Sequence, residues 1–89
     1  MPKLNFKKPF VRKASKITKN SPPLTAKLSK TLETLRDNPF TPSLKTHKLF
    51  GNLSDRYACS LTEDIRITFK LSDDTVHLLN IGSHDIVYD

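Results

Sequence analysis

Three short apolar runs lie between residues 57 and 81 of the chain. In the first two, every second residue is apolar: Tyr57, Cys59 and Leu61, then Ile65, Ile67 and Phe69. This alternation is typical of a strand with one buried face. In the third run, 75–81, apolar residues occupy both odd and even positions, which suits a more central strand. Polar turn residues at 62–64 and 72–74 separate the runs, so the pattern predicts an antiparallel meander.

Apolar residues in the first half of the chain recur at helical spacing instead. Phe10, Ala14 and Ile17 form one stripe behind Pro9, which suits the first position of a helix. The segment 20–23, ending in two prolines, predicts the end of this helix. Leucines at positions 24, 28, 32 and 35 predict a second helix that runs to about Asp37.

The remaining segments complete an α+β fold. Leu4–Phe6 suits a short edge strand because lysines flank it. Residues 38–43 contain two prolines and predict an extended connection, and 44–53 predicts a loop or a short strand leading into the sheet. We therefore predict one domain over residues 1–89, in which an N-terminal helical hairpin packs on a small antiparallel sheet.

Charge is distributed unevenly along the 89 residues. The net charge is +6, and all nine acidic residues lie from Glu33 onward. The basic residues before that point are Lys3, Lys7, Lys8, Arg12, Lys13, Lys16, Lys19, Lys27 and Lys30. Such a surface attracts polyanions, so the asymmetry favours nucleic acid or an acidic protein as a partner over a merely solvated face.

Several classes of site are disfavoured by the sequence. The three histidines and the single cysteine lack zinc-ligand spacing, and no Gly-rich phosphate loop is present, so we predict no metal and no other cofactor. Cys59 lies in an apolar alternation and is expected to be a buried core residue. No run approaches the length of a membrane span and no signal peptide is visible, so the chain is expected in the cytoplasm, away from membranes.

A polar set remains at the turns and ends of the predicted strands. Its members with catalytic chemistry are His47, Asp64, Arg66 and His84. Arg66 alternates with Ile65 and Ile67 and should project from the face opposite the core, where its guanidinium can grip a phosphate. Histidine moves protons near neutral pH, and Asp64 can orient a histidine or accept a proton.

These side chains suit metal-free cleavage of RNA. The reaction needs a base for the ribose 2′-OH, a cation for the pentacoordinate phosphate and an acid for the leaving 5′-oxygen. Tyr88 can stack on a base, and Lys45, Lys48 and Arg56 complete the predicted RNA-binding set. Taken singly, each residue has a simpler explanation, such as a surface histidine or an Asp64–Arg66 ion pair.

Three stretches together resemble the RelE/ParE superfamily of toxins, and within it the YafQ-like branch. They read K-T-H-K-L-F-G-N-L (45–53), R-Y-A-C-S-L-T-E-D-I-R-I-T-F-K-L (56–71) and H-L-L-N-I-G-S-H-D-I-V-Y (77–88). The resemblance covers essentially the whole chain, and G-S-H-D-I-V-Y is its most specific part.

The resemblance implies the toxin of a type II toxin–antitoxin system. Such a toxin is a metal-independent endoribonuclease that cuts mRNA in the ribosomal A site and so inhibits translation. It implies a cognate antitoxin as partner, together with the ribosome and mRNA, and contact with operator DNA only through the antitoxin complex.

Individual residues match the motifs of the family. His47 matches a histidine before the "L-x-G" step, and His84 matches the histidine of "G-T-H", here G-S-H. Asp64 matches the acid that opens the penultimate strand, Arg66 matches a phosphate-contacting arginine, and Tyr88 matches a C-terminal aromatic residue.

Two positions depart from the family pattern and keep alternatives open. Ser60 stands about where YafQ-like members often have a further histidine, and Ile65 stands where the closest branch usually has tryptophan. A serine cannot act as an acid or base there. The alternatives are a ParE-like toxin that acts on DNA gyrase without cutting RNA, and a degenerate toxin that serves as an antitoxin-binding scaffold.

Overall fold

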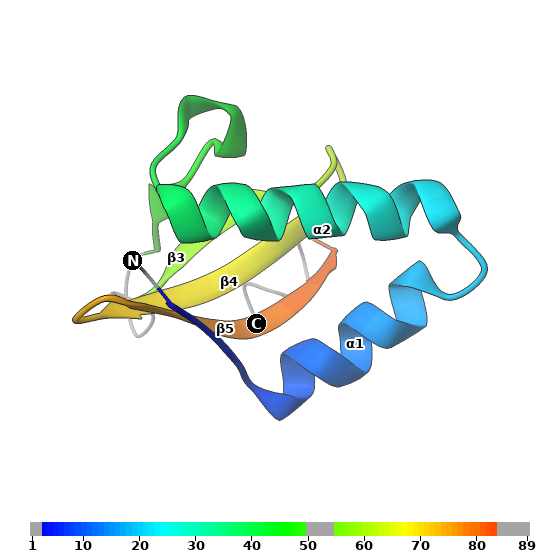
Figure 1. Ribbon diagram of the computed structural model, residues 1–89, viewed down its shortest axis with the longest axis horizontal. Coiled ribbons are helices and arrows are strands. Elements are labelled where there is room, and N and C mark those ends of the chain that lie inside the picture. The colour runs from blue at the N-terminus through cyan, green and yellow to red at the C-terminus, as the bar shows by residue number, and fades with distance from the viewer. Residues whose placement is uncertain (1–2, 50–54, 84–89) are drawn as a thin grey trace.

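The structure is a computed structural model that describes residues 3–49 and 55–83. Its elements in chain order are β1 (Lys3–Phe6), α1 (Lys8–Thr18), α2 (Pro22–Asp37), the 3-10 turn η1 (Pro42–Leu44), β2 (His47–Lys48), β3 (Tyr57–Ser60), β4 (Ile65–Ser72) and β5 (Thr75–Ser83). They form the predicted α+β fold, with two helices against one sheet (Figure 1).

The five strands lie in the order β1-β5-β4-β3-β2. The meander β3-β4-β5 is antiparallel as predicted, and the expected N-terminal strand is present at the edge beside β5. It pairs parallel to β5, so the sheet is only mostly antiparallel. The helix α1 connects β1 to α2 and packs along β5, and this crossover lets β1 run parallel.

Both helices cover one face of the sheet with the predicted apolar stripes. Phe10 and Ala14 of α1 and Leu28 and Leu35 of α2 are buried in one cluster with the sheet. The sheet residues of this cluster are Cys59, Leu61, Ile67, Phe69, Val76, Leu78 and Ile81. These residues define the core face of the sheet.

Cross-strand register identifies the residues on the other face. Ala58, Thr68 and Asn80 lie opposite one another in β3, β4 and β5, and so do Ser60, Arg66 and Gly82. Both rows alternate with the core residues along their strands, so they point away from the helices. We call this the helix-free face, and it carries Arg66 as the alternation predicted.

The structure differs from the sequence-based boundaries at two proline pairs. The first helix ends before residues 20–23, as predicted, but the second begins earlier than its first leucine, because Pro22 and Pro23 are the first two residues of α2. The first helical turn has no internal partners for its N–H groups, so proline fits there without loss. Pro42 and Ser43, expected to be extended, form with Leu44 the 3-10 turn η1, after which Lys45 takes a left-handed conformation with φ 53°.

His77 was expected to be structural, and its contacts agree. It lies on β5 opposite Asn5 of β1, and the two side chains are joined through Asn5 Nδ2 and His77 Nδ1 at 2.9 Å. The contact couples the edge strand to the meander.

Leu35→Ala is expected to destabilise the fold strongly, because Leu35 is 0% exposed at the centre of the helix–sheet contact. Removing a buried leucine side chain costs about 2–5 kcal/mol. Urea unfolding measures the change. Val11→Ala is the control, since Val11 is 48% exposed and its loss should change the free energy of unfolding by less than about 0.5 kcal/mol. Equal effects of the two substitutions would contradict this assignment of the core.

Candidate functional site

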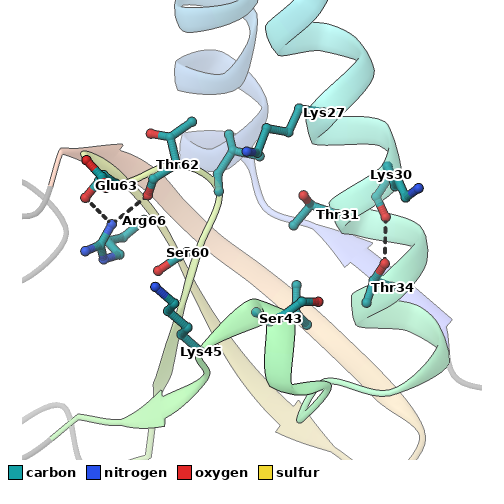
Figure 2. Close-up of a pocket in the computed structure, with 12 residues that line it drawn as sticks. Lys27, Lys30, Thr31, Thr34, Ser43, Lys45, Ser60, Thr62, Glu63 and Arg66 are labelled. Carbon is teal, nitrogen blue, oxygen red and sulfur yellow. Dashed lines mark hydrogen bonds between the residues drawn. The ribbon is translucent and has the colours of Figure 1, made fainter.

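Arg66 is held at the end of the sheet by the turn between β3 and β4. Its Nη1 donates hydrogen bonds to the carbonyl oxygens of Thr62, at 2.8 Å, and Glu63, at 2.6 Å (Figure 2). The simple alternative of an Asp64–Arg66 ion pair is therefore not the arrangement found, because the guanidinium binds main-chain carbonyl oxygens. These neutral acceptors leave its charge in place.

The turn itself is fixed by Thr62. Its Oγ1 accepts hydrogen bonds from the backbone N–H groups of Asp64, at 3.2 Å, and Ile65, at 3.0 Å. Such side-chain bonds hold a short turn in one conformation. The two carbonyl oxygens that bind Arg66 are thus positioned by the chain's own local chemistry.

The remaining donors of Arg66 suit a phosphate. A guanidinium has five N–H groups, and the two bonds above use those of Nη1. Among the described residues the Arg66 side chain makes no other hydrogen bond, and its Nε and Nη2 N–H groups form the second edge of the guanidinium, a two-donor fork. Its cross-strand neighbour Gly82 has no side chain to cover it. This side of a guanidinium binds phosphate oxygens with two parallel hydrogen bonds.

His47 lies on the same face as Arg66. It is exposed in β2 and pairs with Ala58, one row along from Ser60 and Arg66. Two strand spacings, about 10 Å, separate β2 from β4. Long side chains on both can thus reach one ligand between them.

A main-chain carbonyl oxygen holds the ring of His47. Its Nδ1 lies 3.2 Å from the carbonyl oxygen of Lys45, which can only accept, so Nδ1 carries the proton. In the neutral ring Nε2 then holds the lone pair that a base needs. The left-handed backbone of Lys45 brings this carbonyl to the ring.

The other predicted residues are spread more widely. Asp64 is exposed in the β3–β4 turn, and Lys45 and Lys48 are exposed on either side of His47. Arg56 lies at the far end of β3 from Ser60, with its Nε 3.7 Å from Asp55 Oδ1. Lys70 binds the same carboxylate at 3.3 Å, so Asp55 offsets part of the positive charge there.

His84 and Tyr88 lie outside the described residues. The strand that leads to His84 in the sequence is described as far as Ser83, which pairs with Ile65. The described end of β5 is therefore adjacent to Ile65 and Arg66 on β4. Among the described residues, no three metal-ligating side chains lie together.

Sequence reasoning missed two contributors to the site. From the sequence, Thr62 was assigned to a turn and given no further role. A threonine two residues before an aspartate, as at 62–64, can accept the backbone hydrogen bond that fixes such a turn. Gly82 was not singled out. Its place opposite Arg66 depends on the register of β4 and β5, which the sequence alone does not specify.

The whole chain can now be compared with known proteins. Residues 2–89 match the family described as bacterial toxin of type II toxin–antitoxin system, YafQ. This chain belongs to the YafQ toxin family. The comparison with curated protein sequences gave no match.

Solved structures of toxins share the fold. A copper-bound mutant toxin from Helicobacter pylori is similar, with 31% identity and a TM-score of 0.84, covering 98% of this chain and 99% of that one. YafQ from Escherichia coli strain BL21(DE3) has 18% identity and a TM-score of 0.80, with 100% of both chains covered. In the YoeB–YefM complex from Staphylococcus aureus the matched chain has 16% identity and a TM-score of 0.78, covering 94% and 98%.

These comparisons confirm the predicted family and the RelE-like fold. The helices α1 and α2 are too short and too polar to cross a membrane. A type II toxin has a cognate antitoxin, as YoeB has YefM in the S. aureus complex.

Cys59 is confirmed as a core residue and is unsuited to nucleophilic chemistry. It is 0% exposed. Burial raises the pKa of its thiol from 9.0 to about 12, and the nearby positive charge of Arg66 offsets only part of this rise. The thiolate needed for attack is thus nearly absent at neutral pH.

The single thiol should be protected in the folded protein. We expect a disulfide reagent such as DTNB to modify Cys59 slowly at pH 8 and rapidly in urea, as followed by absorbance. Because the folded pKa is raised, the unfolded chain loses its proton first as pH rises, and stability should fall between about pH 9 and 12. Cys59→Ala should reduce this fall. Equally fast labelling in the folded and unfolded states would contradict the burial.

Proposed function

We propose that this YafQ-family chain is a ribosome-dependent endoribonuclease that cleaves mRNA without a metal ion and inhibits translation. The observation that carries the proposal is the geometry of Arg66. Arg66 belongs to the helix-free face, and its guanidinium is anchored there by two neutral carbonyl oxygens that bind a single nitrogen. A guanidinium fixed in this way suits a phosphate whose negative charge grows during the reaction.

In the proposed reaction the RNA supplies its own nucleophile. A base removes the proton of the ribose 2′-OH, and the 2′-oxygen forms a bond to the adjacent phosphorus. The bond from phosphorus to the 5′-oxygen breaks, and an acid protonates that oxygen. The products are a 2′,3′-cyclic phosphate, which can hydrolyse to a 3′-phosphate, and a 5′-OH.

The residues proposed for these steps lie on one side of the sheet or follow it in sequence. Arg66 stabilises the pentacoordinate phosphate. His84 is the central acid or base, with His47 or Asp64 as its complement. The Nδ1 contact with the Lys45 carbonyl oxygen orients the His47 ring, which supports a role for it in proton transfer. Tyr88 is proposed to stack on a base, with Lys45, Lys48 and Arg56 as further RNA contacts.

The proposed setting is the bacterial cytoplasm, where ribosomes and mRNA are found. A cognate antitoxin would bind the toxin and inhibit it, as the pairing of YoeB with YefM suggests. Operator DNA would be contacted only through that complex.

Primer extension on a translated message tests the activity. Purified protein is added to ribosomes programmed with one mRNA, beside His84→Ala and a ribosome-free reaction. We expect cuts within A-site codons that require the ribosome and fall about 10²–10⁴-fold in His84→Ala, the usual contribution of an acid–base group. An intact message would contradict the proposal and lead next to a gyrase supercoiling assay. Cuts that persist in His84→Ala would retain the activity but remove His84 from the site.

Arg66→Ala is expected to slow cleavage about 10²–10³-fold, as for the loss of one preorganised group that stabilises the transition state. Arg66→Lys should recover only part of the rate, since it keeps the charge but not the fork. Single-turnover cleavage on programmed ribosomes measures both.

Arg36→Ala provides the matched control, because Arg36 is an exposed arginine on α2 beside Asp37. It should cleave at the wild-type rate. Circular dichroism checks that each variant folds, since Arg66 also braces the turn. Wild-type cleavage by a folded Arg66→Ala would exclude the proposed role.

A further inference from the structure

A basic groove lies between α2 and the β3–β4 turn, and the reaction proposed above does not account for most of it. Its volume is about 470 Å³. The charged residues that line it are Lys27, Lys30, Lys45, Arg66 and Glu63 (Figure 2). We call it the α2 groove. Four of its five charges are positive.

One face of α2 forms a wall of the α2 groove. Lys27, Lys30, Thr31 and Thr34 line it at spacing i, i+3, i+4 and i+7, which places them on a single stripe. The stripe is about 10 Å long at 1.5 Å per residue. This stripe lies beside the buried leucines of the same helix, Leu28 and Leu35.

The opposite wall is the end of β3 that β2 leaves uncovered. In the described register β2 pairs only with Tyr57 and Ala58, whereas Ser60 and Thr62 line the α2 groove. Arg66, opposite Ser60 on the helix-free face, lines it as well. The α2 groove therefore passes around the edge of the sheet and joins the helix side to the proposed scissile phosphate.

The charges of the lysines are not used within the described fold. The ion pairs among the described residues join Arg36 with Asp37, and Arg56 and Lys70 with Asp55. None of them involves Lys27, Lys30 or Lys45. Glu63, the one acidic residue among those described in the lining, is exposed, and its main-chain carbonyl oxygen accepts a hydrogen bond from Arg66.

The lining indicates the part of a nucleic acid that would fit. Its described residues carry hydroxyl groups, including those of Ser43 and Ser60, and none of them is an aromatic residue on which a base could stack. Lysines and hydroxyls are typical contacts to phosphate oxygens and sugars, which position a strand without reading its sequence. An acidic peptide would need apolar anchor pockets to bind tightly, and the lining offers only Leu44 and Leu61, which are both buried.

We propose that the α2 groove binds the phosphodiester backbone of the RNA strand next to the bond held by Arg66. Lys27 and Lys30 contact successive phosphates, and Lys45 bridges this track to the active site. The inference rests on the proposed function and extends it, since it adds positioning residues on a helix that carries no catalytic group.

The test compares two pairs of lysines with identical spacing. Lys27→Gln/Lys30→Gln alters the α2 groove, and Lys13→Gln/Lys16→Gln alters α1 by the same charge at the same i, i+3 separation. The probe is a fluorescent single-stranded RNA oligonucleotide with 2′-O-methyl groups, which cannot be cleaved. Binding is measured by anisotropy over a series of salt concentrations.

We expect the α2 pair to weaken binding and to reduce the slope of log affinity against log salt by about 1.4, since each lost phosphate contact on a single strand contributes about 0.7. The α1 pair should leave the slope unchanged. Equal effects of the two pairs would show only an effect of net charge and overturn the proposal.

Three further arms separate the outcomes. If the α2 pair weakens binding to vacant ribosomes but not to the oligonucleotide, the RNA is ribosomal and the proposed mRNA track is wrong. If it weakens binding to polyglutamate but not to RNA, the α2 groove serves an acidic polypeptide. Primer extension with the wild type tests the nuclease activity separately. If the wild type cleaves mRNA but the α2 pair binds RNA as tightly as the wild type, only the proposed role of the α2 groove is wrong. If the wild type does not cleave, the proposed nuclease function is wrong, and the role of the α2 groove falls with it.

Discussion

The burial of one sheet face under α1 and α2 is the constraint on which the rest of this structure depends. Because side chains alternate along a strand, placing Ile67 and Cys59 under the helices forces Arg66 and Ser60 onto the other side. The thin core of a small domain leaves little tolerance for a shift, since a slip of one residue would bury Arg66 and expose Ile67. The packing that stabilises the fold thus also fixes the position of the proposed catalytic arginine.

Local hydrogen bonds refine what the packing positions. Thr62 holds the β3–β4 turn, and this turn holds one nitrogen of Arg66, so the position of the guanidinium is set before any ligand binds. A phosphate-binding group that is already in place loses little conformational entropy when the substrate arrives. The same turn borders the α2 groove, so one segment of six residues (61–66) connects the core, the proposed active site and the proposed RNA track.

Much of the fold could be predicted from the sequence because each signal had a local cause. The helical stripes, the meander and the outward direction of Arg66 all follow from periodicity. Proline at 22 and 23 was ambiguous, since it cannot continue a helix without an N–H group, yet its fixed φ suits the first turn of the next helix. The partners of Arg66 and the joining of Lys27 and Lys30 to the sheet edge depend on tertiary geometry, which a periodic pattern does not encode.

The central claim is that the RNA's own 2′-oxygen attacks the phosphate held by Arg66, with protein side chains moving the protons. It is tested most directly by cleavage of an mRNA that carries a single 2′-deoxynucleotide on the 5′ side of a mapped cut. If the 2′-oxygen is the nucleophile, this one cut disappears while cuts at unmodified codons of the same message persist. Continued cleavage at the deoxy position would contradict the account, because the attacking group would then have to be water.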